Sequence, residues 1–189
     1  FAPRKGGSGG EPRRMKWGLY QIHWGGGGFT RGLDAELPKF ASAPDWIMFY
    51  RDLGRPYPRE SCDEIRRRGA VPILSLELWP WGRGSRAGSR LPASVAGEYD
   101  AFFRAWARDA KADGAPVLLR FGFEMNGEWF SWSGDPALFV RAWRRAHGIF
   151  REEGADHVTW VWAPNVQSAP DVPANSMHAY YPGDDVVDR

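Results

Sequence analysis

The sequence predicts an α/β protein in which strands and helices alternate along the chain. Five short runs are rich in aromatic and branched apolar residues, which is typical of buried parallel strands. The stretches between these runs show helical periodicity and contain residues that begin and end helices. We expect the strands at residues 17–22, 46–50, 71–78, 116–123 and 158–162.

The helix between the fourth and fifth predicted strands is the one that the sequence marks best. Asp135 is placed to cap it, Pro136 fits its first turn and Gly154 is placed to end it. Phe139 and Trp143 fall on its apolar face. Further helices are expected at 94–112, at 61–68 and in a short piece after Thr30.

The composition describes one globular unit of 189 residues, of which 43% are apolar and 15% aromatic. No stretch approaches the roughly 18 to 20 uninterrupted apolar residues of a membrane-spanning helix, so no membrane partner is expected. A formal net charge of +2 is too close to neutral to indicate a nucleic-acid partner. Eleven tryptophans fit either a core of large side chains or stacking on sugar rings.

Metal and thiol chemistry find no support in the sequence. The single cysteine, Cys62, has neither a disulfide partner nor companions at metal-ligand spacing. The histidines show no ligand spacing either, so we predict no metal site and no cofactor. They are His23, His147, His157 and His178.

The domain prediction divides the chain near Met15. Residues 1–14 carry a glycine-rich stretch among Arg and Lys and are expected to form a flexible basic tail. Residues 15–189 are expected to form the folded domain. No signal peptide is visible, and the first residue is Phe1, so we expect that a leader or upstream segment has been removed.

Two architectures fit alternating strands and helices: an open doubly wound sheet and a closed (β/α)8 barrel. The glycine run 25–28 lacks the spacing of a dinucleotide or nucleoside-triphosphate loop, which argues against the first. Polar and aromatic residues gather where strands end, as at the carboxyl-terminal rim of a barrel. These clusters are His23-Trp24, Glu77-Leu78-Trp79, Glu124-Met125-Asn126 and Trp162-Ala163-Pro164-Asn165.

The fourth predicted strand carries charged residues on one face. Alternation places Arg120, Gly122 and Glu124 on the inner face, and Phe121 and Phe123 on the face that meets the helices. A guanidinium and a carboxylate are costly to bury unless they are paired or needed for chemistry. Glu124 is therefore a candidate catalytic acid, and the alternative is a buried ion pair in which Arg120 only neutralises it.

The third predicted strand adds a second carboxylate by the same parity. Ile73, Ser75 and Glu77 point inward, while Leu74 and Leu76 point to the helices. Two carboxylates at one rim, with tryptophans nearby, are the equipment of glycoside hydrolysis.

Residues 119–132, LRFGFEMNGEWFSW, resemble the acid/base signature of glycoside hydrolase family 26, the β-mannanases and their relatives. The resemblance continues through 161–165 and 181–185. It implies a (β/α)8 TIM barrel that hydrolyses β-1,4-mannosidic or related β-glycosidic bonds with retention of configuration. It also assigns Glu124 as the general acid/base and Trp129 as a sugar-contacting residue.

Other residues are candidates for substrate binding because of their place at the predicted rim. They are Asn126, Arg120, Glu77, Trp79, Trp162 and His23. Trp81 and Trp132 are further candidate sugar platforms, and Asn165 is a candidate for bonding hydroxyls. Trp160 and Trp162 share strand parity, so that one or both are expected to lie in the core.

The chain departs from the family pattern in two places. Phe123 stands where the family usually has a histidine, just before the acid/base. The family's nucleophile is a glutamate at the end of the seventh strand, whereas only five βα units are counted here. We therefore expect a barrel incomplete at its carboxyl-terminal side, with the first and fifth strands as open edges. The missing strands are expected from a longer polypeptide, a second fragment or another chain.

Three functional readings remain open at this stage. The first is a retaining glycoside hydrolase that acts on a β-linked polysaccharide or oligosaccharide, and that is secreted or extracytoplasmic because its substrate is a polysaccharide. The second is a catalytically inactive carbohydrate-binding or polysaccharide-assembly protein on the same barrel. The third is a hydrolase of β-glucan or β-xylan, which shares the mechanism and differs in its subsites.

Overall fold

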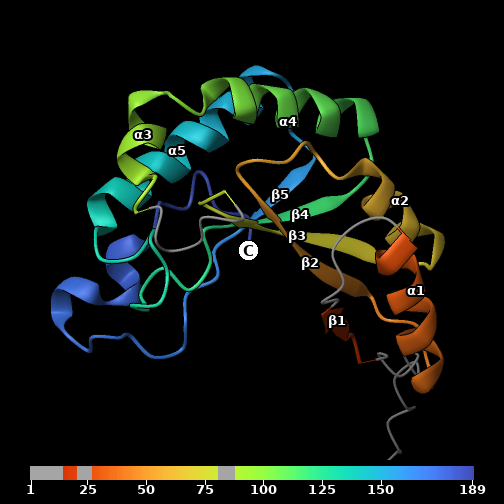
Figure 1. Cartoon of the computed structure of the whole chain (residues 1–189). Coiled ribbons are helices and arrows are strands. Elements are labelled where there is room, and N and C mark those ends of the chain that lie inside the picture. The colour runs from red at the N-terminus through yellow and green to blue at the C-terminus, as the bar shows by residue number, and fades with distance from the viewer. Residues whose placement is uncertain (1–14, 21–26, 81–87) are drawn as a thin grey trace, which may run out of the picture.

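The computed structural model describes residues 15–20, 27–80 and 88–189. Their strands form one parallel sheet in the order β1-β2-β3-β4-β5, as predicted (Figure 1). Each strand lies next to the one that follows it in sequence, as in a barrel, and no topological switch occurs. The strands are β1 (Gly18–Tyr20), β2 (Trp46–Asp52), β3 (Val71–Glu77), β4 (Val117–Phe121) and β5 (Val158–Val161).

The connecting segments contain the expected helices, with α4 and α5 lying across one face of the sheet (Figure 1). The Asp135 side chain accepts a hydrogen bond from the Leu138 amide at 2.9 Å and so caps α5, as predicted. Within the described ranges, no helix is both long and apolar enough to cross a membrane. The helices are α1 (Gly27–Glu36), α2 (Arg59–Arg67), α3 (Leu91–Ala96), α4 (Asp100–Asp113) and α5 (Pro136–Glu152), with short 3-10 turns at Leu37–Lys39, Pro173–Asn175 and Met177–Tyr180.

The single helix predicted over 94–112 is wrong, because the structure divides it into α3 and α4. Gly97 lies in the left-handed region with φ +93°, and its amide closes the last turn of α3 on Ala93 and Ser94. The apolar periodicity continues across this glycine, so that periodicity alone did not reveal the break.

The main core lies between the sheet and the helices. Leu74, Leu76 and Phe121 point from the strands into it and are at most 1% exposed. Phe103 and Trp143 meet them from the helices and are equally buried. The residues on the opposite face of the sheet, such as Ile73 and Arg120, are half-buried. Ser75 lies on the same face but is fully buried. The predicted alternation of β3 and of β4 up to Phe121 is confirmed.

The outer edge of β5 is partly covered, which corrects the expectation of a fully open edge. The Arg189 amide donates to the Trp160 carbonyl at 3.2 Å, and the Trp162 amide donates to the Arg189 carbonyl at 2.8 Å. This pair of bonds is the pattern of a parallel ladder. On the other side of the described sheet, β1 pairs with β2 alone.

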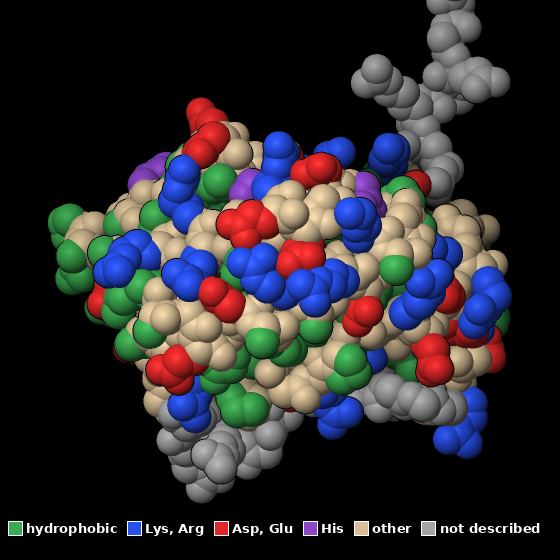
Figure 2. Space-filling model, turned by 90° about the horizontal axis from the view of Figure 1, so that it is seen from above, with side chains coloured by type: hydrophobic (Ala, Val, Ile, Leu, Met, Phe, Trp, Pro, Cys, Tyr) green, Lys and Arg blue, Asp and Glu red, His purple; other side chains and the backbone are tan. Residues whose placement is uncertain are grey.

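The surface over α4 and α5 mixes basic and acidic side chains (Figure 2). Such exposed ion pairs contribute little to stability, because water and salt screen them. This face is therefore a solvated exterior. The pairs that join the two helices are Arg104–Glu152 at 2.8 Å, Arg108–Glu153 at 2.9 Å and Arg145–Asp100 at 2.6 Å.

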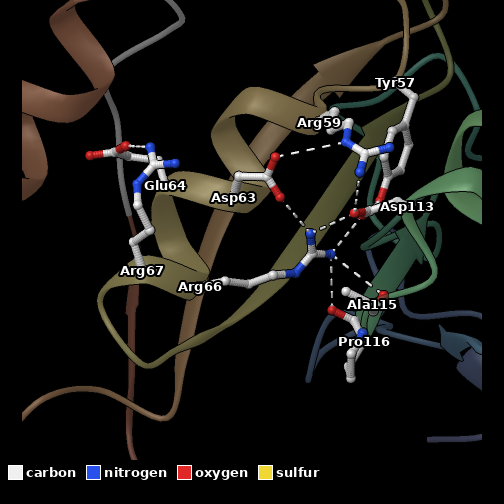
Figure 3. Close-up of polar contacts among 9 residues, drawn as sticks. All are labelled: Tyr57, Arg59, Asp63, Glu64, Arg66, Arg67, Asp113, Ala115 and Pro116. Atoms are coloured by element: carbon white, nitrogen blue, oxygen red, sulfur yellow. Dashed lines mark hydrogen bonds and ion pairs between the residues drawn. The ribbon is translucent and has the colours of Figure 1, made fainter.

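A buried ion pair ties α2 to the end of α4 (Figure 3). The Asp113 side chain is 2% exposed and accepts two hydrogen bonds from Arg66, at 2.9 and 2.8 Å. It accepts a third bond from the Tyr57 hydroxyl at 2.8 Å. Burial raises the pKa of Tyr57 well above its usual range, so this hydroxyl remains a donor. Arg66 also reaches the Pro116 carbonyl at 3.2 Å, just before β4.

Replacement of Asp113 tests the weight of this cluster. Asp113→Ala removes the buried carboxylate that Arg66 and the Tyr57 hydroxyl share, and leaves the Arg66 guanidinium, 19% exposed, paired with Asp63 alone at 3.1 Å. We expect a loss of about 3 kcal/mol in the free energy of unfolding, measured by urea denaturation. The matched control is Asp109→Ala, which removes an exposed carboxylate from the same helix and is expected to change stability by less than about 0.5 kcal/mol. Equal effects of the two substitutions would contradict a special role for the cluster.

Candidate active site

The site begins where β4 ends, at a turn that requires glycine. Gly122 follows the last residue of β4 and has φ +52°. A Cβ atom at this position would come within 2.9 Å of the Leu78 and Phe139 side chains. Its amide donates to the Leu76 carbonyl at 3.0 Å, which fixes the turn against β3. Any other residue would both strain the backbone and clash with the core.

Glu124 is the only non-glycine residue with positive φ among the described residues, at +52°. Its amide donates to the Ala163 carbonyl at 2.7 Å, and its carbonyl accepts from the Gly127 amide at 2.9 Å. A left-handed glutamate costs about 1 kcal/mol or more, and such strain gathers at functional sites. The backbone therefore singles out the same residue as the sequence.

The Glu124 carboxylate lies at the surface between two donors. The Trp129 indole N–H donates to its Oε2 at 3.0 Å. The nearest guanidinium nitrogen of Arg120 is 3.8 Å from Oε1, longer than a hydrogen bond. The Glu124 side chain is 35% exposed, so the carboxylate is not locked in a buried ion pair.

Trp129 is positioned by the glycine that precedes it by two residues. Its side chain is 44% exposed, and a methyl group at Gly127 would overlap its ring. The loop thus lets the indole fold back toward Glu124 while one part of the ring remains open to a ligand. A sugar ring packs well on such an exposed aromatic surface.

Arg120 lies on the inner face of the sheet, as predicted. One of its nitrogens is 3.4 Å from the Ser75 hydroxyl oxygen and 3.7 Å from the Met48 sulfur. Burial raises the pKa of Tyr50 on β2, and the positive charge of Arg120 opposes this rise. Sequence analysis did not single out Tyr50, although the alternation along β2 places it on this face.

Phe123 corrects the predicted alternation. It was expected to face the helices, but its ring lies 5.2 Å from that of Tyr50 and 4.4 Å from the Arg120 guanidinium carbon. The turn at Gly122 ends the strand geometry, so that period-two parity does not reach Phe123.

The other tryptophans near the rim are either fully buried or half-buried. Trp132, a predicted sugar platform, is 0% exposed and donates its indole N–H to the Phe123 carbonyl at 2.8 Å, so it belongs to the core. Trp79 is half-buried against it, with ring centroids 4.7 Å apart. Trp160 is also core at 2% exposure, whereas Trp162 is half-buried and contacts Tyr181 at 5.0 Å.

Asn126 does not lie where a sugar could reach it. It is 0% exposed, and its amide nitrogen donates to the Asn165 carbonyl at 2.9 Å and the Ser168 hydroxyl at 3.1 Å. Its amide oxygen accepts from the Asn165 amide at 2.7 Å. Asn126 therefore fastens the loop after β5 to the loop after β4, in place of the predicted contact with substrate hydroxyls.

Asn175 and Tyr180 extend this buried network, and sequence analysis missed both. The Asn175 side chain donates to the Asn126 carbonyl at 2.8 Å and accepts from the Tyr180 hydroxyl at 2.7 Å. The same hydroxyl accepts from the Gly134 amide at 3.0 Å. No periodic pattern marks residues 170–180, so no sequence signal could have found these contacts.

Glu77, a further candidate, ends β3 at the rim and is half-buried. Burial is the main cause of the raised pKa values of Tyr20 and Tyr50, and the negative charge of Glu77 adds to the rise. His23 and Trp81 lie outside the described residues. Among the described ranges, no group of His, Cys, Asp and Glu is arranged to hold a metal ion.

Comparison with known proteins places this rim in a family. The sequence model described as Glycosyl hydrolase family 26 matches residues 95–189, which hold Glu124, Trp129 and the loop after β5. The chain belongs to glycosyl hydrolase family 26. The resemblance predicted from residues 119–132 is thereby confirmed.

Similar proteins are found both by sequence and by structure. Endoglucanase H of Acetivibrio thermocellus is 28% identical over 141 residues, which cover 71% of this chain and 14% of that protein. Mannan endo-1,4-beta-mannosidase of Bacillus subtilis is 30% identical over 91 residues, 43% of this chain and 24% of that protein. The chain thus spans less than a quarter of the length of either relative.

Solved structures of family 26 enzymes establish the fold. The β-mannanase of Bacteroides ovatus superposes with a TM-score of 0.63 at 21% identity, over 94% of this chain and 60% of that chain. The endo-β-1,4-mannanase of Cellulomonas fimi gives 0.67 at 18% identity, over 92% and 47%. The described α/β unit is therefore part of a TIM barrel, as the sequence predicted.

The loop network at the rim generates a prediction about Asn126. Asn126→Ala removes the bonds to Asn165 and Ser168, and we expect it to lower the free energy of unfolding by about 1 to 3 kcal/mol. The Asn165 amide, which loses its acceptor, is expected to exchange its hydrogen faster. Gln167→Ala is the control, because it trims an exposed side chain of the same loop. Unchanged exchange at Asn165 in Asn126→Ala would show that Asn126 does not hold the loop.

Proposed function

We propose that this chain is part of a retaining glycoside hydrolase that cleaves β-1,4-mannosidic or related β-glycosidic bonds in polysaccharides, with Glu124 as the general acid/base. The observation that carries the proposal is the Glu124 carboxylate at the carboxyl-terminal rim, which is 35% exposed and accepts a hydrogen bond from the exposed Trp129. Membership of family 26 and the names of its relatives, a mannosidase and an endoglucanase, support it.

The proposed reaction is a double displacement. Protonated Glu124 donates its proton to the glycosidic oxygen while a second carboxylate, about 5 to 5.5 Å away, attacks the anomeric carbon. Glu124 then takes a proton from the water that releases the sugar from the glycosyl-enzyme. We assign the nucleophile to a strand beyond the five described here, because the family resemblance places it after a seventh strand.

The chain's other rim residues hold the acid and the sugar in this scheme. Trp129 fixes the orientation of the carboxyl group through its indole N–H and offers its open ring surface to a sugar. Arg120 supplies a positive charge 3.8 Å from the carboxylate. We assign substrate-binding roles to Glu77, Trp79 and Trp162, whose side chains are half-buried around the same rim, and to His23. Asn126 acts through the loops that it fastens.

The natural setting follows from the substrate class. Plant and microbial β-linked polysaccharides lie outside the cell, so we propose a secreted or extracytoplasmic enzyme. Residues 15–189 would form the first part of its catalytic barrel, completed by further strands of the same polypeptide or of a second chain. A carbohydrate-binding protein without activity is the alternative that the following experiment separates.

The test compares three carboxamide variants of the complete protein on β-mannan and on mixed-linkage β-glucan. Glu124→Gln is expected to lower kcat/KM by about 10²- to 10⁴-fold, because it removes the proton donor. The loss should be much smaller on an aryl glycoside whose leaving group needs no protonation. Glu128→Gln changes an exposed carboxylate in the same loop and is expected to keep activity. Glu77→Gln is expected to raise KM more than it lowers kcat.

If Glu124→Gln releases sugar as fast as the wild type does, Glu124 has no part in the mechanism. Binding of both polysaccharides without any release of reducing sugar would replace the hydrolase with the inactive binding protein.

A further inference from the structure

Phe123 holds a position next to the proposed acid/base at which the family pattern has a titratable side chain. Its ring is 2% exposed, and the Arg120 guanidinium carbon lies 4.4 Å from the ring centroid. A guanidinium within about 6 Å of an aromatic face is attracted by the electron density of the ring. The contact therefore joins Phe123, the residue before Glu124, to Arg120, whose guanidinium lies near the Glu124 carboxylate.

The Phe123 ring is fixed by its surroundings. Tyr50, Phe130 and Trp132 pack around it at centroid distances of 5.2, 5.1 and 5.5 Å, each nearly perpendicular to it. The Trp132 indole also donates to the Phe123 carbonyl at 2.8 Å. Close packing of this kind leaves one rotamer for the ring, so its face is a rigid support for Arg120.

A side-chain hydrogen bond joins Arg120 to Tyr50. The other polar contacts of Arg120 are long and measure 3.4 Å to the Ser75 hydroxyl, 3.7 Å to the Met48 sulfur and 3.8 Å to the Glu124 carboxylate. A guanidinium free to move would close on the carboxylate to about 2.7 to 2.9 Å and bind it with two charge-assisted hydrogen bonds. A carboxyl group held in that way keeps its negative charge and donates a proton poorly.

We propose that Phe123 is a positioning residue for the reaction: its ring face holds the Arg120 guanidinium near Glu124 but short of a closed ion pair. The carboxyl group of Glu124 thereby keeps one side for Trp129 and the other for the glycosidic oxygen. The inference rests on the proposed role of Glu124 as acid/base. The contact between Phe123 and Arg120 itself is independent of that role and is tested separately.

The first test measures the contact by NMR on the complete protein, without substrate. Side-chain protons of Arg120 above the ring face are expected to resonate upfield, and Arg120→Lys identifies their signals. Phe123→Leu is expected to remove the upfield shift, whereas Phe123→Tyr keeps the ring and the shift. Phe121→Leu is the control, since Phe121 is equally buried but faces the helices. Arg120 signals without an upfield shift, or a shift that survives in Phe123→Leu, would overturn the proposal.

The second test measures catalysis in the complete protein with a double-mutant cycle. Phe123→Leu is expected to lower kcat about tenfold and to change KM by less than about twofold. Phe123→Tyr keeps the aromatic ring and is expected to keep the kcat of the wild type. In an Arg120→Met background, Phe123→Leu should cause no further loss. If the fold-loss of kcat in the double variant equals the product of the losses in the two single variants, Phe123 does not act through Arg120 and the proposal is overturned. Absence of hydrolysis in the wild type would defeat the proposed function instead, and the NMR result would still decide the contact.

Discussion

The arrangement of this rim depends on one backbone constraint, the glycine turn at the end of β4. Gly122 has φ +52°, and a side chain there would press on Leu78 and Phe139. Because the strand geometry stops at this point, Phe123 turns to the inner face and Glu124 takes a left-handed conformation of its own. Its amide can then bond to Ala163 at the end of β5. The positions of Phe123 and Glu124 both follow from this turn.

The second requirement is a rigid connection between neighbouring loops. A parallel sheet brings the carboxyl ends of its strands to one rim, but it does not fix the loops that follow them. Here the side chains of Asn126 and Asn175 fix the loops. Both are at most 7% exposed, and their amide groups form hydrogen bonds with backbone groups of the two loops. A buried amide without partners is costly, so such a network is held in one arrangement.

Much of the fold follows from the sequence because hydrophobic period reports burial directly. The strands and the inner position of Arg120 could be predicted in this way, whereas the strand order followed from the barrel that the strand-end residues and the family resemblance indicated. The capping of α5 by Asp135 followed from local chemistry. The division at Gly97 could not be predicted, because apolar residues continue on both sides of it. Long-range packing is equally invisible to periodicity.

The sequence singled out two residues that the structure brings together. Strand alternation indicated Glu124, the family resemblance implied Trp129, and the Trp129 indole nitrogen lies 3.0 Å from the Glu124 carboxylate. Trp132 and Asn126 were candidates for sugar contact because of their place at the predicted rim, but both side chains are 0% exposed. Phe123 was misplaced because strand parity was carried one residue past the turn. Backbone conformation at Gly122 accounts for the position of Phe123.

The hydrogen bond between Trp129 and Glu124 is the most direct consequence of the turn, and it can be measured without any substrate. The measurement is the NMR resonance of the Trp129 indole N–H as a function of pH. If the turn places the carboxylate as described, this resonance will shift as Glu124 takes up a proton, and the shift will vanish in Glu124→Gln. A Trp129 resonance that does not respond to pH, or that responds equally in Glu124→Gln, would contradict the account.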